Sequence, residues 1–287
     1  MIYQLVKLCS RLLCLLPVRL QRSAGNLLGA ACWPLVPPKR RRMAIDNIMR
    51  SLAVDRPTAQ KIAKTSATRF GRMFTEVLCL PELRADNIGC RVELNGKEHL
   101  EEALSYGHGA VIATAHAGNW ELLGASLAMH GFPLIAVAQK QTNEQMDRFI
   151  NEYRTMAGMH VTYKTGVREM IRMLGQGKII GLLMDQHAGR DGVWVDFFGR
   201  RASTATGAAA LARMKGAPIV PAFITEKPDG THTVLLHPIV WPDKTEVKDE
   251  DIRQTTQRLT TIIEAHIRQY PQEWFWLHNR WKHSPDQ

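Results

Sequence analysis

From about residue 90 onward, short apolar runs alternate with longer amphipathic segments, and this alternation constrains the fold more than any other feature. Short apolar runs are typical of buried strands, whereas apolar residues spaced about 3.6 apart indicate helices. Strands separated by single helices predict an α/β fold with a mixed, mostly parallel central sheet flanked by helices. The expected strands are 110–115, 133–138, 178–185, 192–198, 217–224 and 232–240, and the expected helices are 120–130, 143–158, 167–177, 204–216 and 249–270.

Residues 43–80 have helical apolar spacing, with Pro57 at a favourable first helical position and Pro81 as a stop. We therefore expect residues 43–90 to be a helical lead-in to an α/β domain that spans 43–287. A boundary near residue 42 separates this domain from an N-terminal segment of different composition.

Residues 1–42 are predicted to form a membrane-anchoring helical segment, because they contain no acidic residue and are rich in leucine. Gln4, Lys7 and Arg11 share one helical face and apolar side chains cover the rest, which is typical of a helix lying in a membrane interface. A spanning helix needs about 20 apolar residues, but charges interrupt this run and Pro17 ends its best part. The basic cluster at 39–42 would attract anionic lipids.

Other interpretations of this segment are a cleaved signal peptide, a lipoprotein signal around Cys32, and a soluble helical hairpin packed on the core. We favour a peripheral anchor, with a re-entrant path through residues 26–36 left open. The net charge of +10 indicates an anionic partner. Nucleic acid is disfavoured because the basic residues cluster at the apolar N-terminus and no reader motif is present. The five cysteines form no CxxC pair, which fits a reducing compartment.

The stretch "VIATAHAGNWELLG" (111–124) places His116 at the end of an expected strand and Glu121 in the first turn of an expected helix. Ligands bind outside the carboxyl ends of strands in open α/β sheets. If Gly118 makes a tight turn and Asn119 caps the helix, Glu121 can accept the imidazole N–H of His116. That contact would make the other ring nitrogen a better base.

Five ordered blocks resemble the bacterial lipid A biosynthesis acyltransferases, the late lauroyl and myristoyl transferases within the glycerolipid acyltransferase superfamily. The blocks cover nearly the whole chain: "RRMAIDNI", "TAHAGNWELLG", "VREMIRMLGQGKIIGLLMDQHAG", "VDFFGRRASTATGAAALARMKGAPIVPAFI" and "PQEWFWLHNRWK". The resemblance implies a glycerolipid acyltransferase-like fold, with His116 as general base, Glu121 as its partner, and Arg168 and Asp185 as further site residues.

The resemblance implies transfer of a fatty acyl chain from a thioester to a hydroxyl of a lipid A precursor or related glycolipid. The co-substrate would be acyl carrier protein or coenzyme A carrying the acyl chain, with no other cofactor. The partners would be anionic membrane lipids, acyl carrier protein and a glycolipid acceptor. The protein would lie at the cytoplasmic face of the bacterial inner membrane, bound peripherally or by a single pass. Backbone N–H groups at Gly118 and Asn119, or Arg168, are candidate oxyanion donors, and Arg200 is a candidate phosphate ligand.

One position departs from the family pattern, where a tyrosine-arginine pair usually follows the second strand. Here Gln139 and Lys140 stand there, and lysine lacks the planar fork of arginine. A phosphatidylinositol mannoside or another lysolipid therefore remains an alternative acceptor. Hydrolysis with the same pair, or a non-enzymatic membrane-surface role, are further alternatives. No metal is expected, because Asp185, His187 and Asp191 fit no standard ligand spacing.

Overall fold

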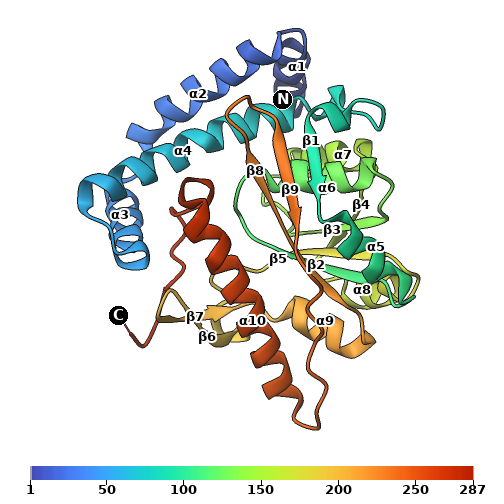
Figure 1. Ribbon diagram of the computed structural model, residues 1–287. Helices are drawn as coiled ribbons and strands as arrows, with labels where there is room; N and C mark the ends of the chain where they lie inside the picture. The colour runs from blue at the N-terminus through green and yellow to red at the C-terminus, as the bar shows by residue number, and fades with distance from the viewer. Residues whose placement is uncertain (1, 287) are drawn as a thin grey trace.

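A seven-stranded sheet in the order β1-β9-β8-β2-β5-β3-β4 organises the computed structural model, which describes residues 2–286 (Figure 1). Only the β8–β9 pair is antiparallel among the pairings of this sheet, so β1 and β9 run against the other five strands. The predicted mixed, mostly parallel sheet is therefore confirmed. Its strands are β1 (Val92–Asn95), β2 (Ala110–Thr114), β3 (Leu134–Ala138), β4 (His160–Tyr163), β5 (Ile179–Leu183), β8 (Ile219–Glu226) and β9 (His232–Leu236).

The central strand β2 shows why both faces of the sheet are covered. Val111 and Ala113 lie in one buried apolar cluster, which helices α8, α9 and α10 complete. Ala110 and Ile112 point the opposite way into a second cluster, completed by α5, α6 and α7. These helices are α5 (Lys97–Ser105), α6 (Trp120–Met129), α7 (Glu144–Met156), α8 (Val167–Leu174), α9 (Gly207–Lys215) and α10 (Lys248–Gln269).

A separate antiparallel hairpin, β6 (Val193–Phe197) and β7 (Arg200–Thr204), follows β5. Its turn has positive φ at Phe198 and Gly199. The alternating segment predicted at 192–198 is thus a strand, but it lies outside the main sheet. β1, β4 and β7 were not anticipated, since their short polar sequences carry no continuous apolar run.

Four helices precede the sheet: α1 (Ile2–Cys14), α2 (Val18–Leu35), α3 (Pro38–Leu52) and α4 (Arg56–Leu78). Pro17 separates α1 from α2, as expected, and Asp55 caps α4 by accepting the Thr58 N–H. The expected helical lead-in is therefore two helices joined where Ala53 takes a left-handed conformation. The expected boundary at residue 42 falls inside α3.

Helix α2 lies along α4 (Figure 1). Glycines allow the close approach: a Cβ placed at Gly71 would lie 2.4 Å from the Gly29 nitrogen, and one at Gly29 would lie 2.3 Å from the Thr68 oxygen. The N-terminal segment is thus packed on the body of the protein through a helix–helix contact with little room for side chains.

Helix α1 contacts the body through Lys7, which pairs with Glu152 of α7 at 2.6 Å, and through Ser10, which donates to the Leu78 carbonyl at 2.6 Å. Leu5, Leu8 and Leu12 of this helix are exposed, and α2 continues the apolar surface. None of the described helices is long and apolar enough to cross a membrane. The exposed leucines of this surface, here called the leucine face, are Leu5, Leu8, Leu12, Leu15, Leu16, Leu20, Leu27, Leu28 and Leu35.

Candidate active site

The register of the parallel strands β2 and β5 brings His116 and Asp185 together. Thr114 lies opposite Leu183, so the residues two positions beyond them leave the same edge of the sheet side by side. His116 Nδ1 lies 2.8 Å from Asp185 Oδ1. The other carboxylate oxygen, Oδ2, accepts the indole N–H of Trp274 at 2.7 Å. Both oxygens of Asp185 are therefore engaged, and the carboxylate is fixed in position.

The electrostatics of this pair assign the ring nitrogens of His116. The side chain of Asp185 is 1% exposed. Burial opposes its ionisation, but the attraction of His116 and the hydrogen bonds from His116 and Trp274 leave the pKa of Asp185 below its usual value. An ionised carboxylate only accepts hydrogen bonds, so Nδ1 of His116 carries the proton and the lone pair lies on Nε2. This arrangement is that of an oriented general base.

The loop that carries His116 is held by the C-terminal segment. The Phe275 N–H donates to the His116 carbonyl at 3.0 Å, and the Gly118 N–H donates to the Glu273 carbonyl at 3.0 Å. Gly118 has φ +61°, and a Cβ there would lie 2.1 Å from the Ile224 oxygen, so the predicted tight turn requires glycine. Because the Gly118 N–H is already engaged, it is not an available oxyanion donor.

Asn119 has the predicted capping role. Its Oδ1 accepts the Leu122 N–H at 3.0 Å, and its amide donates to Glu76 Oε2 at 2.8 Å. Burial raises the pKa of Glu76 to about 7. The cap of α6 is thus tied to α4 by a partly buried hydrogen bond that the sequence does not predict.

Aromatic rings fix the imidazole from the other side. The His116 ring meets Trp120 edge-to-face, with centroids 4.9 Å apart. Phe70 of α4 contacts both Trp120 and Phe275, with centroid distances of 5.7 and 4.5 Å. Such packing leaves the ring few alternative rotamers, so its orientation does not depend on Asp185 alone.

The predicted pairing of His116 with Glu121 is wrong in this structure. Glu121 instead receives a two-pronged contact from Arg154 of α7, with Nε at 2.8 Å and a terminal nitrogen at 2.6 Å. Burial disfavours the charge of this arginine, yet its hydrogen bonds to Glu121 raise the pKa of Arg154. The physical reason is that His116 and Glu121 each find a partner far away in the chain. The partner of His116 is Asp185, at the end of a neighbouring strand, and the partner of Glu121 is Arg154, on a neighbouring helix.

The three predicted basic residues do not contact the His116–Asp185 pair. Lys140 and Arg168 follow β3 and β4 and are exposed. Arg200 binds Ser51 Oγ at 2.7 Å and lies over the Trp281 ring at 3.6 Å, so it joins β7 to α3 and the C-terminal segment. Burial lowers its pKa to about 10. The expected role of Arg200 as a phosphate ligand is thus not supported by its contacts.

Trp274 and Arg154 are the site residues that sequence reasoning missed. The tryptophan-rich block "PQEWFWLHNRWK" is visible in the sequence. Nothing in the sequence indicates which indole reaches Asp185. His278 lies in the same segment, and its Nε2 accepts the His187 N–H at 3.0 Å, while burial lowers the pKa of His278 to about 4. His278 therefore acts as a neutral acceptor that positions the loop after β5.

Comparisons with known proteins find a matching family model, sequence relatives and a solved structure. The sequence model of the bacterial lipid A biosynthesis acyltransferase family matches residues 1–283. A phosphatidylinositol mannoside acyltransferase of Mycolicibacterium smegmatis is 29% identical over 82% of this chain and 79% of its own length. A lipid A biosynthesis lauroyltransferase of Escherichia coli is 28% identical over 68% of this chain and 63% of its own length. Among solved structures, the 1-acyl-sn-glycerophosphate acyltransferase PlsC from Thermotoga maritima superposes with a TM-score of 0.39 at 14% identity, covering 88% of this chain and 99% of that one.

Proposed function

The chain belongs to the bacterial lipid A biosynthesis acyltransferase family, and from this premise we propose that it acylates a hydroxyl of a lipid A precursor or a related glycolipid. The acyl donor is a thioester on acyl carrier protein or coenzyme A. Membership in the family makes the chain an acyltransferase. The donor, the acceptor and the mechanism are our proposal.

In the proposed reaction, Nε2 of His116 takes the proton of the acceptor hydroxyl as its oxygen attacks the thioester carbonyl carbon. The carbon–sulfur bond breaks, an ester forms, and the departing thiolate receives the proton from the imidazolium. A positioned general base contributes about 10² to 10⁴ in rate. Asp185 stabilises the imidazolium by its negative charge and holds the ring in the required tautomer.

The contact of 2.8 Å between His116 and Asp185 is the observation that carries this proposal. A buried, ionised carboxylate is costly unless it is paired, and here Asp185 is paired with Nδ1 of His116. The other ring nitrogen, Nε2, is left for chemistry. The pair lies where parallel strands end, the usual position of ligands in such sheets. The side chain of His116 is 21% exposed, so a substrate can reach it.

We further propose that the protein works at the cytoplasmic face of the bacterial inner membrane, bound peripherally to anionic lipids. The support is the leucine face, which is exposed on α1 and α2, together with the basic cluster at 39–42. Leucines that face solvent along consecutive helices are unfavourable in water but favourable in a lipid interface. The charges of the cluster would add about 1 kcal/mol each near anionic headgroups.

A phosphatidylinositol mannoside is the second candidate acceptor. It is favoured by the similarity to the Mycolicibacterium smegmatis enzyme at 29% identity and by Lys140, which stands where the lipid A enzymes usually carry arginine. A transfer assay decides between the candidates, with lauroyl-acyl carrier protein or lauroyl-coenzyme A as donor and each glycolipid as acceptor. His116→Ala should remove transfer, and the exposed His108→Ala is the matched control. Equal rates in the two variants would contradict the proposal.

A further inference from the structure

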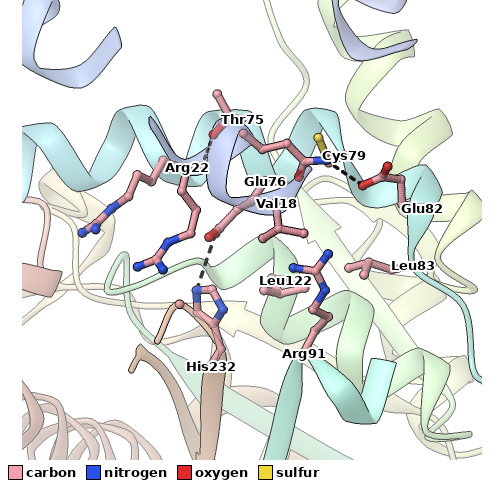
Figure 2. A pocket seen from close by; sticks show the side chains of 13 residues that line it. Val18, Arg22, Thr75, Glu76, Cys79, Glu82, Leu83, Arg91, Leu122 and His232 are labelled. Carbon is pink, nitrogen blue, oxygen red and sulfur yellow. Dashed lines mark hydrogen bonds and ion pairs between the residues drawn. The ribbon is translucent and has the colours of Figure 1, made fainter. Parts of the chain in front are cut away.

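A small cavity of about 50 Å³ lies between α2, α4 and the start of β1 (Figure 2). Three arginines, Arg22, Arg72 and Arg91, line it, and we call it the arginine cavity. Neither the catalytic pair nor the leucine face accounts for three guanidinium groups gathered here.

Arg91 is the clearest sign of a missing ligand. Its guanidinium extends into the cavity below Val18 and beside Leu122 (Figure 2). Its side chain makes no hydrogen bond or ion pair within the part of the chain that the structure describes, although the residue is half-buried. Its backbone is fixed, because the Arg91 carbonyl accepts the His232 N–H at 2.8 Å. A half-buried guanidinium has five donors that need acceptors.

Arg22 and Arg72 are only partly satisfied. Each places a terminal nitrogen near Glu226, at 2.9 and 3.1 Å, but the Nε of each is buried and has no partner among the described residues. Buried donors without acceptors are rare and call for an explanation such as a bound ion or water. Arg69 shares the same carboxylate at 3.2 Å. Glu226 thus serves three guanidinium groups, of which Arg69 also pairs with Glu273.

The remaining acids do not remove this cationic surplus. Glu82 receives a hydrogen bond from Gln21 at 3.1 Å and makes no ion pair with Arg91 among the described residues. Burial raises the pKa of Glu76 and of Glu273 to about 7, so neither is fully ionised near neutral pH. The arginine cavity is therefore short of negative charge.

We propose that the arginine cavity binds the phosphate group of a membrane lipid through Arg91, Arg22 and Arg72. Guanidinium groups recognise phosphate by paired, charge-assisted hydrogen bonds. The cavity also has apolar lining from Val18, Leu83 and Leu122. Val18, Gln21 and Arg22, which also line it, belong to α2, and this helix carries part of the leucine face. A phosphate ester with attached apolar chains matches both the charge and the lining.

The arginine cavity lies next to the catalytic loop. A second, smaller cavity of about 20 Å³ shares Arg72, Glu76 and His232 with it and is also lined by Gly118 and Asn119. Identifying the bound lipid with the acyl acceptor rests on the proposed function, whereas the binding itself does not.

Binding to the full chain in detergent tests the inference. The probes are inorganic phosphate, dihexanoyl phosphatidic acid, and dihexanoylglycerol, which has the same chains without the phosphate. Thermal unfolding at several concentrations gives a Kd for each probe. Wild type should bind phosphatidic acid about tenfold or more tightly than dihexanoylglycerol. Arg91→Gln should remove that preference, and the exposed Arg84→Gln, an equal change of charge, should keep it.

Equal binding of the two lipids by wild type would overturn the inference, as would an equal loss in Arg84→Gln, which would indicate surface charge alone. If inorganic phosphate binds as tightly as phosphatidic acid, the lipid source is wrong. Because binding is measured without acyl transfer, Arg91-dependent binding in a protein that transfers no acyl chain would overturn only the proposed function. Competitive inhibition of transfer by phosphatidic acid would support the acceptor assignment.

Discussion

Asp185, and not Glu121, is the carboxylate that contacts the imidazole of His116, at 2.8 Å from Nδ1. Trp274 holds its second oxygen at 2.7 Å, so strand β5 and the C-terminal segment both orient the proposed base. Glu121 is the nearer acid in sequence, yet it binds Arg154. The two acids therefore have different roles, which mutagenesis can separate.

Asp185→Asn should abolish most activity while the protein stays folded. An amide keeps the size of the carboxylate but loses the charge that stabilises the imidazolium, and its NH₂ group can force the wrong ring tautomer. We expect kcat to fall about 10² to 10⁴. Steady-state kinetics and circular dichroism check this. A variant with more than a tenth of the wild-type kcat would show that Asp185 does not assist His116.

Glu121→Gln should mainly lower stability. It leaves the largely buried Arg154 without its counter-charge, and removing one partner of a buried pair typically costs about 3 to 5 kcal/mol. Thermal unfolding should therefore shift clearly downward, while kcat at a permissive temperature stays within about tenfold. Glu121→Gln combined with Arg154→Met should recover part of the stability. A normal melting temperature with a large loss of kcat would return Glu121 to a catalytic role.

Much of the fold could be predicted from the sequence because apolar periodicity records burial directly. β2 is buried on both faces and reads as a nearly uninterrupted apolar run, and α7 begins where the helix over 143–158 was expected, with Asn143 accepting the Gln145 N–H at 3.0 Å. β4 was missed because a short edge strand such as His160–Tyr163 needs no long apolar run. Strand order was likewise not readable, since it depends on long-range pairing.

Only the part of the site that depends on local sequence could be predicted. His116, Gly118 and Asn119 form a local motif whose turn and cap follow from residue chemistry. The partner of the histidine depends instead on the register of β2 against β5, which places Asp185 beside it. Contacts between residues so distant in sequence leave no local pattern, and the local sequence therefore favours Glu121, the nearest acid, as the partner of His116.

Gly118→Ala should be far more disruptive than Gly177→Ala. Both glycines have positive φ, +61° and +77°, but only the Cβ at position 118 meets an obstacle, the Ile224 oxygen at 2.1 Å. Gly177→Ala should cost about 1 to 2 kcal/mol from backbone strain alone. Gly118→Ala adds a steric clash and moves the loop of His116. Denaturant unfolding and kcat compare the two, and equal effects would mean that the loop tolerates displacement.

The stability of Glu76→Gln relative to wild type should increase as the pH rises. Burial raises the folded-state pKa of Glu76 to about 7, above its ordinary 4.5. The folded state then binds more protons than the unfolded state between these values, so this group's contribution to stability falls as pH rises through that window. The slope is at most about 1.4 kcal/mol per pH unit. Glutamine removes this term, and the variant should gain relative stability from pH 5 to pH 8.

The free energy of unfolding of the variant must be compared with that of wild type, because buried histidines change stability with pH in the opposite direction to Glu76. Burial lowers the pKa of His232 and His278 to about 4 and that of His266 to about 3, so each favours folding increasingly as pH rises toward 6.5. The contributions of His266 and His278 are shared by wild type and variant and largely cancel in the comparison. His232 Nε2 lies 3.5 Å from Glu76 Oε2, so the measured difference includes the change in this contact. A pH-independent difference in the free energy of unfolding would contradict the assignment to Glu76.

The last prediction concerns the leucine face. Leu5, Leu8 and Leu12 are exposed on α1, while Lys7 of this helix contacts the body of the protein. Replacing all three leucines by glutamine should change the melting temperature little, because each of these residues is more than half exposed. Binding to vesicles that contain phosphatidylglycerol should weaken at least about 100-fold, since each leucine contributes on the order of 1 kcal/mol or more when it enters the lipid.

Met214→Gln is the matched control, since Met214 is exposed and apolar but lies on α9, outside the leucine face. Sedimentation with vesicles of increasing phosphatidylglycerol content separates the two forces involved. The basic cluster at 39–42 should make binding depend on anionic lipid and on salt, whereas the leucines should affect binding at every composition. If the triple variant bound as wild type does, the leucine face would not be the membrane contact. Binding lost equally in Met214→Gln would place that contact elsewhere on the molecule.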